Sequence, residues 1–184
     1  AALRTSAVRR DDSWVLNGSK TFITNGYTAD LVIVAARTSP EKKAKGITLF
    51  AVESGTPGFE RGRKLDKVGQ PEANTSELFF NDVVLTDEHV IGEVDRGFIQ
   101  MMEQLPQERI GAAVGNLAQA RSILNETLDY ARTREAFGQT IGSFQHNKFL
   151  LAELVTKIDV TQAYVDACVD AHARAELTAV DAAK

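Results

Sequence analysis

The pattern of apolar residues changes once along this 184-residue chain, near Gly92, and this change constrains the fold more than any other feature. Residues 1–91 contain short runs of apolar and β-branched residues separated by glycines and prolines, without helical periodicity. Such runs are typical of strands joined by tight turns. They cover residues 13–16, 20–24, 31–35, 47–52, 77–80 and 83–85. This pattern predicts an antiparallel β-barrel or sandwich for residues 1–91.

Two Asn-Gly pairs lie within the β-like part of the chain. Asn17-Gly18 separates the first two strand-like runs, and Asn25-Gly26 follows the second. Asn-Gly is a strong signal for a two-residue hairpin turn because both residues tolerate a positive φ. The first pair therefore predicts a tight turn between two short strands.

From residue 92 onward the pattern becomes helical. Residues 97–132 carry apolar side chains at helical spacing, and Pro106 inside this segment predicts a bend or a division, since proline lacks an amide donor. Ser143 is the expected N-cap of a second helix that runs to about Ala175, and residues 177–184 resemble the opening of another. Residues 92–184 thus predict the first helices of an up-and-down bundle, and the chain as a whole is α+β.

Composition excludes several classes of function. With 43% hydrophobic and 25% charged residues, the chain has the content of a globular protein rather than a disordered one. A net charge of -4 provides no basic field for a nucleic-acid partner. The longest apolar run, residues 31–36, is much shorter than the roughly 20 residues of a membrane span. Because the sequence starts without methionine and leads almost directly into strand-like residues, we expect a piece of a longer chain.

Cysteine and histidine residues do not form a metal-binding pattern. Cys168 is the only cysteine, so neither an internal disulfide nor a multi-thiolate metal site is expected. The three histidines are scattered and match no metal-ligand spacing. We therefore expect no metal centre.

The first candidate functional segment is residues 20–26, Lys-Thr-Phe-Ile-Thr-Asn-Gly. Because side chains alternate along a strand, Phe22 and Thr24 should face the same side. Such a pair could lie against a planar cofactor, with the ring of Phe22 as apolar surface and the Thr24 hydroxyl as hydrogen-bond partner. The alternative is a hairpin strand with Phe22 in the core and Thr24 on the surface.

The second candidate is the break between the two helical segments, which contains Arg134, Phe137, Gly138 and Gln145. An arginine fork suits a pyrophosphate, and glycine allows a close approach of the backbone. Alternatively, Arg132 and Arg134 could complement the negative C-terminal end of the preceding helix.

The third candidate is Glu108, within Leu-Pro-Gln-Glu-Arg at residues 105–109. At helical spacing it falls on a stripe with Met101, Leu105, Ala112 and Gly115. An apolar setting disfavours the ionised form of a carboxylate and favours a general base, and small neighbours leave room for a ligand. The alternatives are a structural glutamate paired with arginine, or a solvated one if Pro106 breaks the register.

Taken together, the chain resembles the acyl-CoA dehydrogenase family of flavoproteins. The matching stretches are residues 14–26, 46–50, 65–69 and 134–138, with Gln145, and they occur in the family's order along nearly the whole chain. The resemblance implies that residues 1–91 form most of the middle β domain and residues 92–184 the start of the C-terminal helical domain.

The resemblance also implies a cofactor and partners. Phe22, Ile23 and Thr24 correspond to residues at the FAD isoalloxazine ring, and Arg134, Phe137 and Gln145 to residues at its pyrophosphate and adenine across a subunit interface. A homodimer or homotetramer, and electron-transfer flavoprotein as acceptor, are therefore expected. The location would be the cytoplasm of a bacterium or the mitochondrial matrix of a eukaryote.

By the same resemblance, the segment around Glu108 is similar to the long-chain type, which carries its catalytic glutamate on this helix. Glu108 would remove the α-proton of an acyl-CoA thioester while a β-hydride passes to the flavin, giving a trans-2-enoyl-CoA in fatty-acid β-oxidation. A medium- to long-chain substrate is expected. The substrate-binding positions would be Lys45, Ile99, Pro106, Gln107, Glu108 and Arg109.

Three alternatives remain at this point. The family member could carry its base on a later C-terminal segment, which would leave Glu108 structural. It could be an acyl-CoA oxidase, which uses oxygen as acceptor. From another class, it could be a non-catalytic binding module that has kept the fold.

Overall fold

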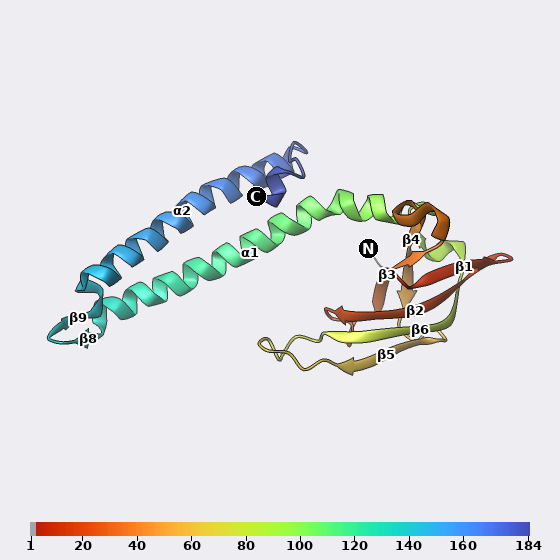
Figure 1. Ribbon diagram of the computed structural model, residues 1–184, viewed down its shortest axis with the longest axis horizontal. Coiled ribbons are helices and arrows are strands. Elements are labelled where there is room, and N and C mark those ends of the chain that lie inside the picture. The colour runs from red at the N-terminus through yellow and green to blue at the C-terminus, as the bar shows by residue number, and fades with distance from the viewer. Residues whose placement is uncertain (1–2) are drawn as a thin grey trace. The chain divides into compact units, whose positions relative to one another are not determined.

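The computed structural model of the chain describes residues 3–184 and divides into two compact units, Ala1–Met102 and Glu103–Lys184 (Figure 1). The division falls inside the first long helix, α1, which spans Gly97–Thr133. The predicted domain boundary at residues 91/92 lies before this helix, and it stays a prediction.

The first unit is a seven-stranded sheet with the strand order β5-β6-β2-β1-β3-β4-β7. Neighbouring strands pair antiparallel, apart from β1 and β3, which pair in parallel where Ser6 meets Arg37. The strands are β1 (Ser6–Arg10), β2 (Ser13–Ile23), β3 (Leu31–Arg37), β4 (Ile47–Glu53), β5 (Phe59–Lys64), β6 (Ser76–Leu85) and β7 (Val90–Ile91). Two 3-10 segments, Pro40–Gly46 and Asp87–His89, lie in the connections.

The sheet curls around its own apolar face. Trp14 on β2 and Phe50 on β4 pack edge to face with ring centroids 5.7 Å apart, although two strands separate β2 from β4 in the sheet. Phe50 and Leu16 are completely buried, and each contributes roughly 2 kcal/mol or more of apolar transfer free energy. The outermost strands, β5 and β7, do not pair with each other. The predicted antiparallel β unit is therefore confirmed, as one open curled sheet rather than a closed barrel.

Asn17-Gly18 does not form the predicted turn. Both residues lie inside β2, where the pairing with β6 shifts register between Leu16 and Gly18. The Asn17 amide donates to Asp82 Oδ1 and accepts from the Asp82 backbone N–H, both at 2.9 Å. Gly18 has φ +137°, and a Cβ there would lie 2.7 Å from Thr5 Cα. Asn17-Gly18 thus forms a β-bulge rather than a turn, and Gly18 allows the backbone of Thr5 to approach closely.

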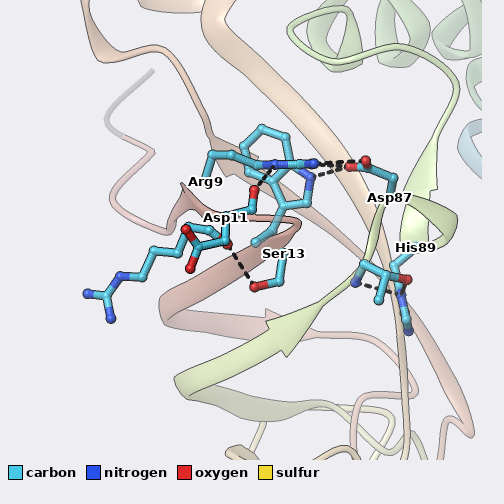
Figure 2. A network of polar contacts seen from close by, with 8 residues as sticks. Arg9, Asp11, Ser13, Asp87 and His89 are labelled. Carbon is cyan, nitrogen blue, oxygen red and sulfur yellow. Dashed lines mark hydrogen bonds and ion pairs between the residues drawn. The ribbon is translucent and has the colours of Figure 1, made fainter.

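A polar cluster ties the β1–β2 hairpin to the turn before β7 (Figure 2). The Arg9 guanidinium forms a two-pronged pair with the Asp87 carboxylate, and Trp14 Nε1 donates to Asp87 Oδ1 at 2.8 Å. The guanidinium also lies over the Trp14 ring, 5.2 Å from its centroid. The hydrogen bonds from Arg9 and from Trp14 lower the pKa of Asp87. These contacts hold the β1–β2 hairpin against the Asp87–His89 turn.

The sequence predicted a bend or a division at Pro106. Helix α1 runs through Pro106 as one helix, so the division does not occur, and the bend stays a prediction. Proline removes one donor, the N–H that would bond the Met102 carbonyl four residues earlier. A helix of 37 residues retains its other hydrogen bonds and continues past this single loss. The boundary between the two compact units falls directly after Met102.

In the second unit, α1 packs against α2 (Gln145–Ala173) along a narrow seam (Figure 1). An ion pair between Arg121 and Asp159, 3.3 Å apart, lies beside it. The most buried seam residues of α1 recur every seven positions, which is the spacing of coiled-coil-like helix pairs. These residues are Ile110, Leu117, Leu124 and Ala131, and Val165 and Cys168 are the buried residues of α2. The prediction of long bundle-type helices is confirmed.

The connection between the helices differs from the expected cap. Ser143 is not the N-cap of α2: it ends the 3-10 turn Ile141–Ser143, and its hydroxyl donates to the Thr140 carbonyl at 2.6 Å. Phe144 occupies the N-cap position with no side-chain hydrogen bond. The predicted helix opening near the end of the chain is only the short 3-10 turn Asp181–Ala183. Within residues 3–184, every helix is too short or too polar to cross a membrane.

Candidate functional site

The first candidate segment ends β2 in an unusual conformation. Phe22 has φ +60°, and the pairing with β6 shifts register between Lys20 and Ile23. A left-handed backbone is a genuine outlier for a bulky side chain and costs of order 1–3 kcal/mol. Despite this, the Phe22 ring is 77% exposed, so no core packing within this chain explains its position. Strained residues of this kind cluster at ligand sites.

The neighbours of Phe22 fix its direction. Ile23 packs against the hydrophobic core, whereas Thr24 is exposed. A turn follows, in which the Gly26 N–H donates to the Ile23 carbonyl at 3.1 Å. The alternative with Phe22 in the core is therefore wrong, and Phe22 and Thr24 both remain available to a ligand.

Lys20 lies on the same strand, two residues before Phe22, and faces the interior. It pairs with the fully buried Leu78 of β6, and its ammonium donates to the Ala35 carbonyl of β3 at 2.8 Å. Burial lowers the pKa of Lys20. The ammonium thus links β2 to β3, which braces the end of β2 that carries Phe22.

The second candidate segment is a two-stranded hairpin between the helices, β8 (Glu135–Ala136) and β9 (Gln139–Thr140). Its loop residues, Phe137 and Gly138, have φ +55° and +80°, the signs that a type I′ turn requires. Glycine adopts this conformation readily, but phenylalanine does so at a cost. Phe137 is nonetheless 96% exposed, and its ring lies edge-on to the ring of Phe144, with 6.4 Å between centroids.

Arg134 and Gln145 lie on either side of this hairpin, and both are exposed. The Arg134 carbonyl accepts the Ile141 N–H at 2.8 Å, which closes the base of the hairpin. Arg132 pairs with Asp129 within α1, 3.4 Å apart. The structure thus gathers Arg134, Phe137 and Gln145 in one exposed segment.

The third candidate, Glu108, does not have the predicted apolar surroundings within this chain. It precedes Ile110 of the buried seam by two residues, which places it about 200° around the helix. Glu108 is exposed, as are Ala112 and Gly115 of its stripe. Ala112 and Gly115 do lie on one face of α1 with Glu108, but α2 packs against a different face, the one that carries Ile110 and Leu117. The described residues therefore match the solvated alternative, although the helix keeps its register through Pro106.

The surface around Glu108 is open. A Cβ added at Gly111 or Gly115 would meet no atom within 4 Å. Of the adjacent predicted substrate positions, Gln107 and Arg109 are exposed and Pro106 is half-buried. Within residues 3–184, no ion pair joins Glu108 to Arg109 or to another residue. The small neighbours leave the space that the sequence predicted beside the carboxylate.

The remaining two substrate positions lie in the β unit. Lys45 is exposed in the Pro40–Gly46 segment, and Ile99 is half-buried in the first turn of α1. The Pro40–Gly46 segment kinks at Lys43, which has φ +55°. Neither position has a contact that tests its predicted role.

Asp95 anchors the Pro40–Gly46 segment, and the sequence analysis did not select it. Its carboxylate accepts hydrogen bonds from the hydroxyls of Thr38 and Ser39 and from the Lys42 ammonium, at 2.6, 2.8 and 2.7 Å. The Asp95 N–H donates to Thr48 Oγ1 at 2.8 Å. Burial alone would raise the pKa of Asp95, but these hydrogen bonds outweigh it and lower the pKa. The only indication of this role in the sequence is an aspartate two residues before Gly97, where α1 begins.

Comparison with known proteins agrees with the fold and with the order of the segments. Residues 1–83 match the family described as "Acyl-CoA dehydrogenase, middle domain", and residues 95–184 match "Acyl-CoA dehydrogenase, C-terminal domain". The chain therefore belongs to the acyl-CoA dehydrogenase family, a family of flavin-dependent oxidoreductases.

Individual relatives agree with this assignment. A long-chain specific acyl-CoA dehydrogenase, mitochondrial, of Rattus norvegicus is 45% identical over 182 residues, which cover 98% of this chain and 42% of that protein. An acyl-CoA dehydrogenase from Geobacillus kaustophilus superposes with a TM-score of 0.95 at 40% identity, covering 98% of this chain and 48% of that one. Butyryl-CoA dehydrogenase from Megasphaera elsdenii gives a TM-score of 0.94 at 39% identity, with the same coverage. The chain thus spans less than half the length of these relatives.

Proposed function

We propose that this chain forms the flavin-facing β unit and the base-carrying helix of an FAD-dependent acyl-CoA dehydrogenase. The observation that carries the proposal is the pair of exposed, left-handed phenylalanines, Phe22 and Phe137. Each costs conformational free energy and leaves an aromatic residue in solvent, a combination that favours a ligand contact. Thr24 beside Phe22, and Arg134 and Gln145 beside Phe137, add hydrogen-bond groups to the two apolar rings.

These residues fit the chemistry of FAD. The ring of Phe22 offers apolar surface to a planar heterocycle, with Ile23 anchored in the core behind it and the Thr24 hydroxyl beside it. The Arg134 guanidinium can bind a pyrophosphate with two parallel N–H donors. Phe137 and Gln145 would contact the adenine portion. Bound FAD would supply the acceptor for the hydride that leaves the substrate.

We assign Glu108 as the base that removes the α-proton of the acyl-CoA thioester. The open surface at Gly111 and Gly115 supports this role because it lets an acyl chain lie beside the carboxylate. Arg109 would adjust the electrostatics of the site, while Pro106 and Gln107 would contact substrate. Lys45 and Ile99 would contact the CoA portion. Proton removal and hydride loss from adjacent carbons would yield a trans-2-enoyl-CoA, the α,β-dehydrogenation step of fatty-acid β-oxidation.

The 45% identity to a long-chain specific relative supports a medium- to long-chain substrate. We further propose residues 1–91 and 92–184 as the two domains, a homodimer or homotetramer as the assembly, and electron-transfer flavoprotein as the acceptor. The enzyme would work in the cytoplasm of a bacterium or in the mitochondrial matrix of a eukaryote.

Anaerobic flavin spectroscopy on the full-length protein tests this proposal. We expect one FAD per subunit and bleaching of the flavin absorbance on addition of a long-chain acyl-CoA, with 2-enoyl-CoA as product. Peroxide formation in air at the rate of turnover would instead identify an oxidase. A full-length protein that neither binds FAD nor bleaches would contradict the proposal and would leave a non-catalytic module.

A further inference from the structure

Lys20 is a charged side chain of the β unit that the proposed reaction does not use. Its stem lies on the core side of β2, because Lys20 pairs with the fully buried Leu78 of β6. Opposite residues of an antiparallel pair place their side chains on the same face of a sheet. The ammonium donates to the Ala35 carbonyl of β3 at 2.8 Å. The charge is therefore held between β2 and β3, in a half-buried residue.

This cation has no counter-charge in the part of the chain that the structure describes. Within residues 3–184, its ammonium forms no ion pair, and its hydrogen bond to Ala35 goes to a neutral carbonyl. Burial lowers the pKa of Lys20, and no neighbouring carboxylate raises it again. Lys42 shows the opposite case, since the hydrogen bond to Asp95 and the charge of that carboxylate raise its pKa. A partly buried cation without a counter-charge costs free energy, which a nearby negative charge would offset.

The candidate flavin segment follows Lys20 on the same strand. Between the pairs Lys20–Leu78 and Ile23–Ser76, β2 has two residues where β6 has one, which is a β-bulge. Because of the extra residue, the Phe22 side chain is exposed although Lys20 lies on the core side. A planar ligand against Phe22 would thus have a fixed positive charge behind β2. Protein rather than water lies between them, so the charge is screened less than in solvent.

We propose that the charge of Lys20 raises the reduction potential of FAD bound at Phe22 and Thr24. This inference rests on the proposed function and deepens it. In the proposed reaction the substrate α-proton passes to Glu108, and the β-hydrogen leaves with its electron pair for the flavin. The flavin ring is neutral when oxidised, so it gains one negative charge together with the two electrons. A fixed positive charge nearby stabilises the reduced form relative to the oxidised form.

Redox titration of the full-length, FAD-loaded protein against a reference dye tests the inference. Lys20→Met keeps an unbranched apolar stem and removes the charge. It should lower the equilibrium constant for two-electron reduction about tenfold, which corresponds to about 30 mV in midpoint potential. Lys20→Arg keeps the charge and should retain the wild-type potential. The affinity of Lys20→Met for oxidised FAD should stay close to that of the wild type, because the oxidised ring is neutral.

Two control variants separate the charge from the packing of the sheet. Lys64→Met removes an exposed lysine of β5, whose charge water screens, and should leave the potential unchanged. Ser76→Ala removes a buried hydroxyl that has no hydrogen-bond partner among the described residues, on the residue that pairs with Ile23. It changes no charge and should also leave the potential unchanged. A shift as large as that of Lys20→Met would assign the effect to packing and overturn the inference.

Three further results would overturn it. An unchanged potential in Lys20→Met, with FAD still bound, would mean that the charge of Lys20 does not act on the flavin. Loss of FAD or of the fold in Lys20→Met, measured by fluorescence titration and thermal denaturation, would make Lys20 structural. An equally lowered potential in Lys20→Arg would assign the effect to side-chain shape. In each case, bleaching of the wild-type flavin by an acyl-CoA would still support the proposed function, so the two failures are distinguishable.

Discussion

The two units of this chain bury their side chains to different depths. In the β unit, Leu16, Phe50 and Leu78 are completely inaccessible to solvent, whereas the most buried seam residue of the helical unit, Ala131, is still 6% exposed. The helical pair also leaves large apolar side chains in solvent, including Phe149 at 61% and Val160 at 67%. A curled sheet can enclose a core within one layer, but two helices share only a seam. We therefore expect the β unit to supply most of the intrinsic stability.

The candidate site residues lie outside the well-packed parts of both units. Phe22 follows the most buried stretch of β2, and Phe137 lies at the tip of a hairpin between the helices. Both combine a left-handed backbone with an exposed ring. A rigid sheet can hold such strain directly, whereas the hairpin relies on its turn geometry. Phe22 and Phe137 are therefore distinguished from the packed residues of both units by backbone strain and exposure together.

The largest expected effect comes from replacing one phenylalanine in each unit by alanine and comparing the two losses of stability. Phe50→Ala in the 184-residue chain should lower the free energy of unfolding by about 3–5 kcal/mol, because it leaves a cavity in the sheet core. Phe149→Ala, on the exposed face of α2, should change it by less than about 0.5 kcal/mol. Denaturant titration followed by circular dichroism measures both. Similar losses at the two positions would refute the contrast in packing.

A smaller effect should follow from removal of the Asp95 anchor. Asp95→Ala should cost about 2 kcal/mol of local stability, since it removes three hydrogen bonds to one carboxylate. Because the pKa of Asp95 is lowered in the fold, its contribution is complete above the ordinary aspartate range and disappears as pH falls through the lowered value. The hydrogen-exchange protection factors of the amides in residues 38–46, which correct for the slower intrinsic exchange in acid, should therefore fall in acid for the wild type. In Asp95→Ala the same amides should exchange fast at neutral pH already, and slow exchange there would count against the anchor.

The next effect concerns Phe22 and Phe137, whose left-handed backbones cost stability and whose rings we expect to bind FAD. Phe22→Asn and Phe137→Asn should each weaken FAD binding to the full-length protein about fivefold, through loss of aromatic contact of about 1 kcal/mol. Neither should lower stability, because asparagine tolerates a left-handed backbone better than phenylalanine does. Fluorescence titration with FAD and thermal denaturation measure the two effects. The control is Phe149→Asn, an exposed phenylalanine within a helix, which should leave FAD affinity unchanged.

The smallest effects concern exposed ion pairs. Asp159→Asn should change the free energy of unfolding by less than about 1 kcal/mol, with a difference that shrinks in high salt. Asp87→Asn should be more harmful, because Asp87 also accepts the Trp14 N–H. Since the pKa of Asp87 is lowered, its contribution should be lost as the pH falls below the ordinary aspartate range. Thermal melts at low and high salt, each at neutral and acid pH, compare the two. If Asp159→Asn and Asp87→Asn change the melting temperature equally under all of these salt and pH conditions, the Trp14 hydrogen bond adds nothing to the Asp87 ion pair.

Much of the fold could be predicted from the sequence because periodicity reports burial. The core strands carry apolar runs, but β5 reads Phe-Glu-Arg-Gly-Arg-Lys and is mostly exposed, so hydrophobic pattern could not reveal this edge strand. Asn17-Gly18 has the composition of a turn, and only the contacts with Asp82 and Thr5 show a bulge. Ser143 does not cap α2 because its hydroxyl donates to the carbonyl of Thr140, three residues earlier in the chain.

The candidate site was less accessible to sequence reasoning. Two stripes of α1 compete for the packed position, and small residues at Ala112 and Gly115 made the Glu108 stripe look suitable for burial. Packing against α2 selects the seam through Leu117 and Leu124 instead. The strain at Phe22 and Phe137 depends on backbone angles that no residue pattern specifies. The Asp95 anchor joins residues 38–48 to residue 95, a contact that only the folded chain brings together.

The most direct test concerns Glu108. The full-length wild type, Glu108→Gln and the control Glu103→Gln, another exposed glutamate of α1, are mixed anaerobically with a long-chain acyl-CoA while flavin absorbance is followed. We expect all three to hold FAD, and Glu108→Gln alone to bleach slower by about 10²–10⁴-fold, the contribution of a general base. If Glu108→Gln bleaches as fast as the wild type, the base lies elsewhere and Glu108 is structural.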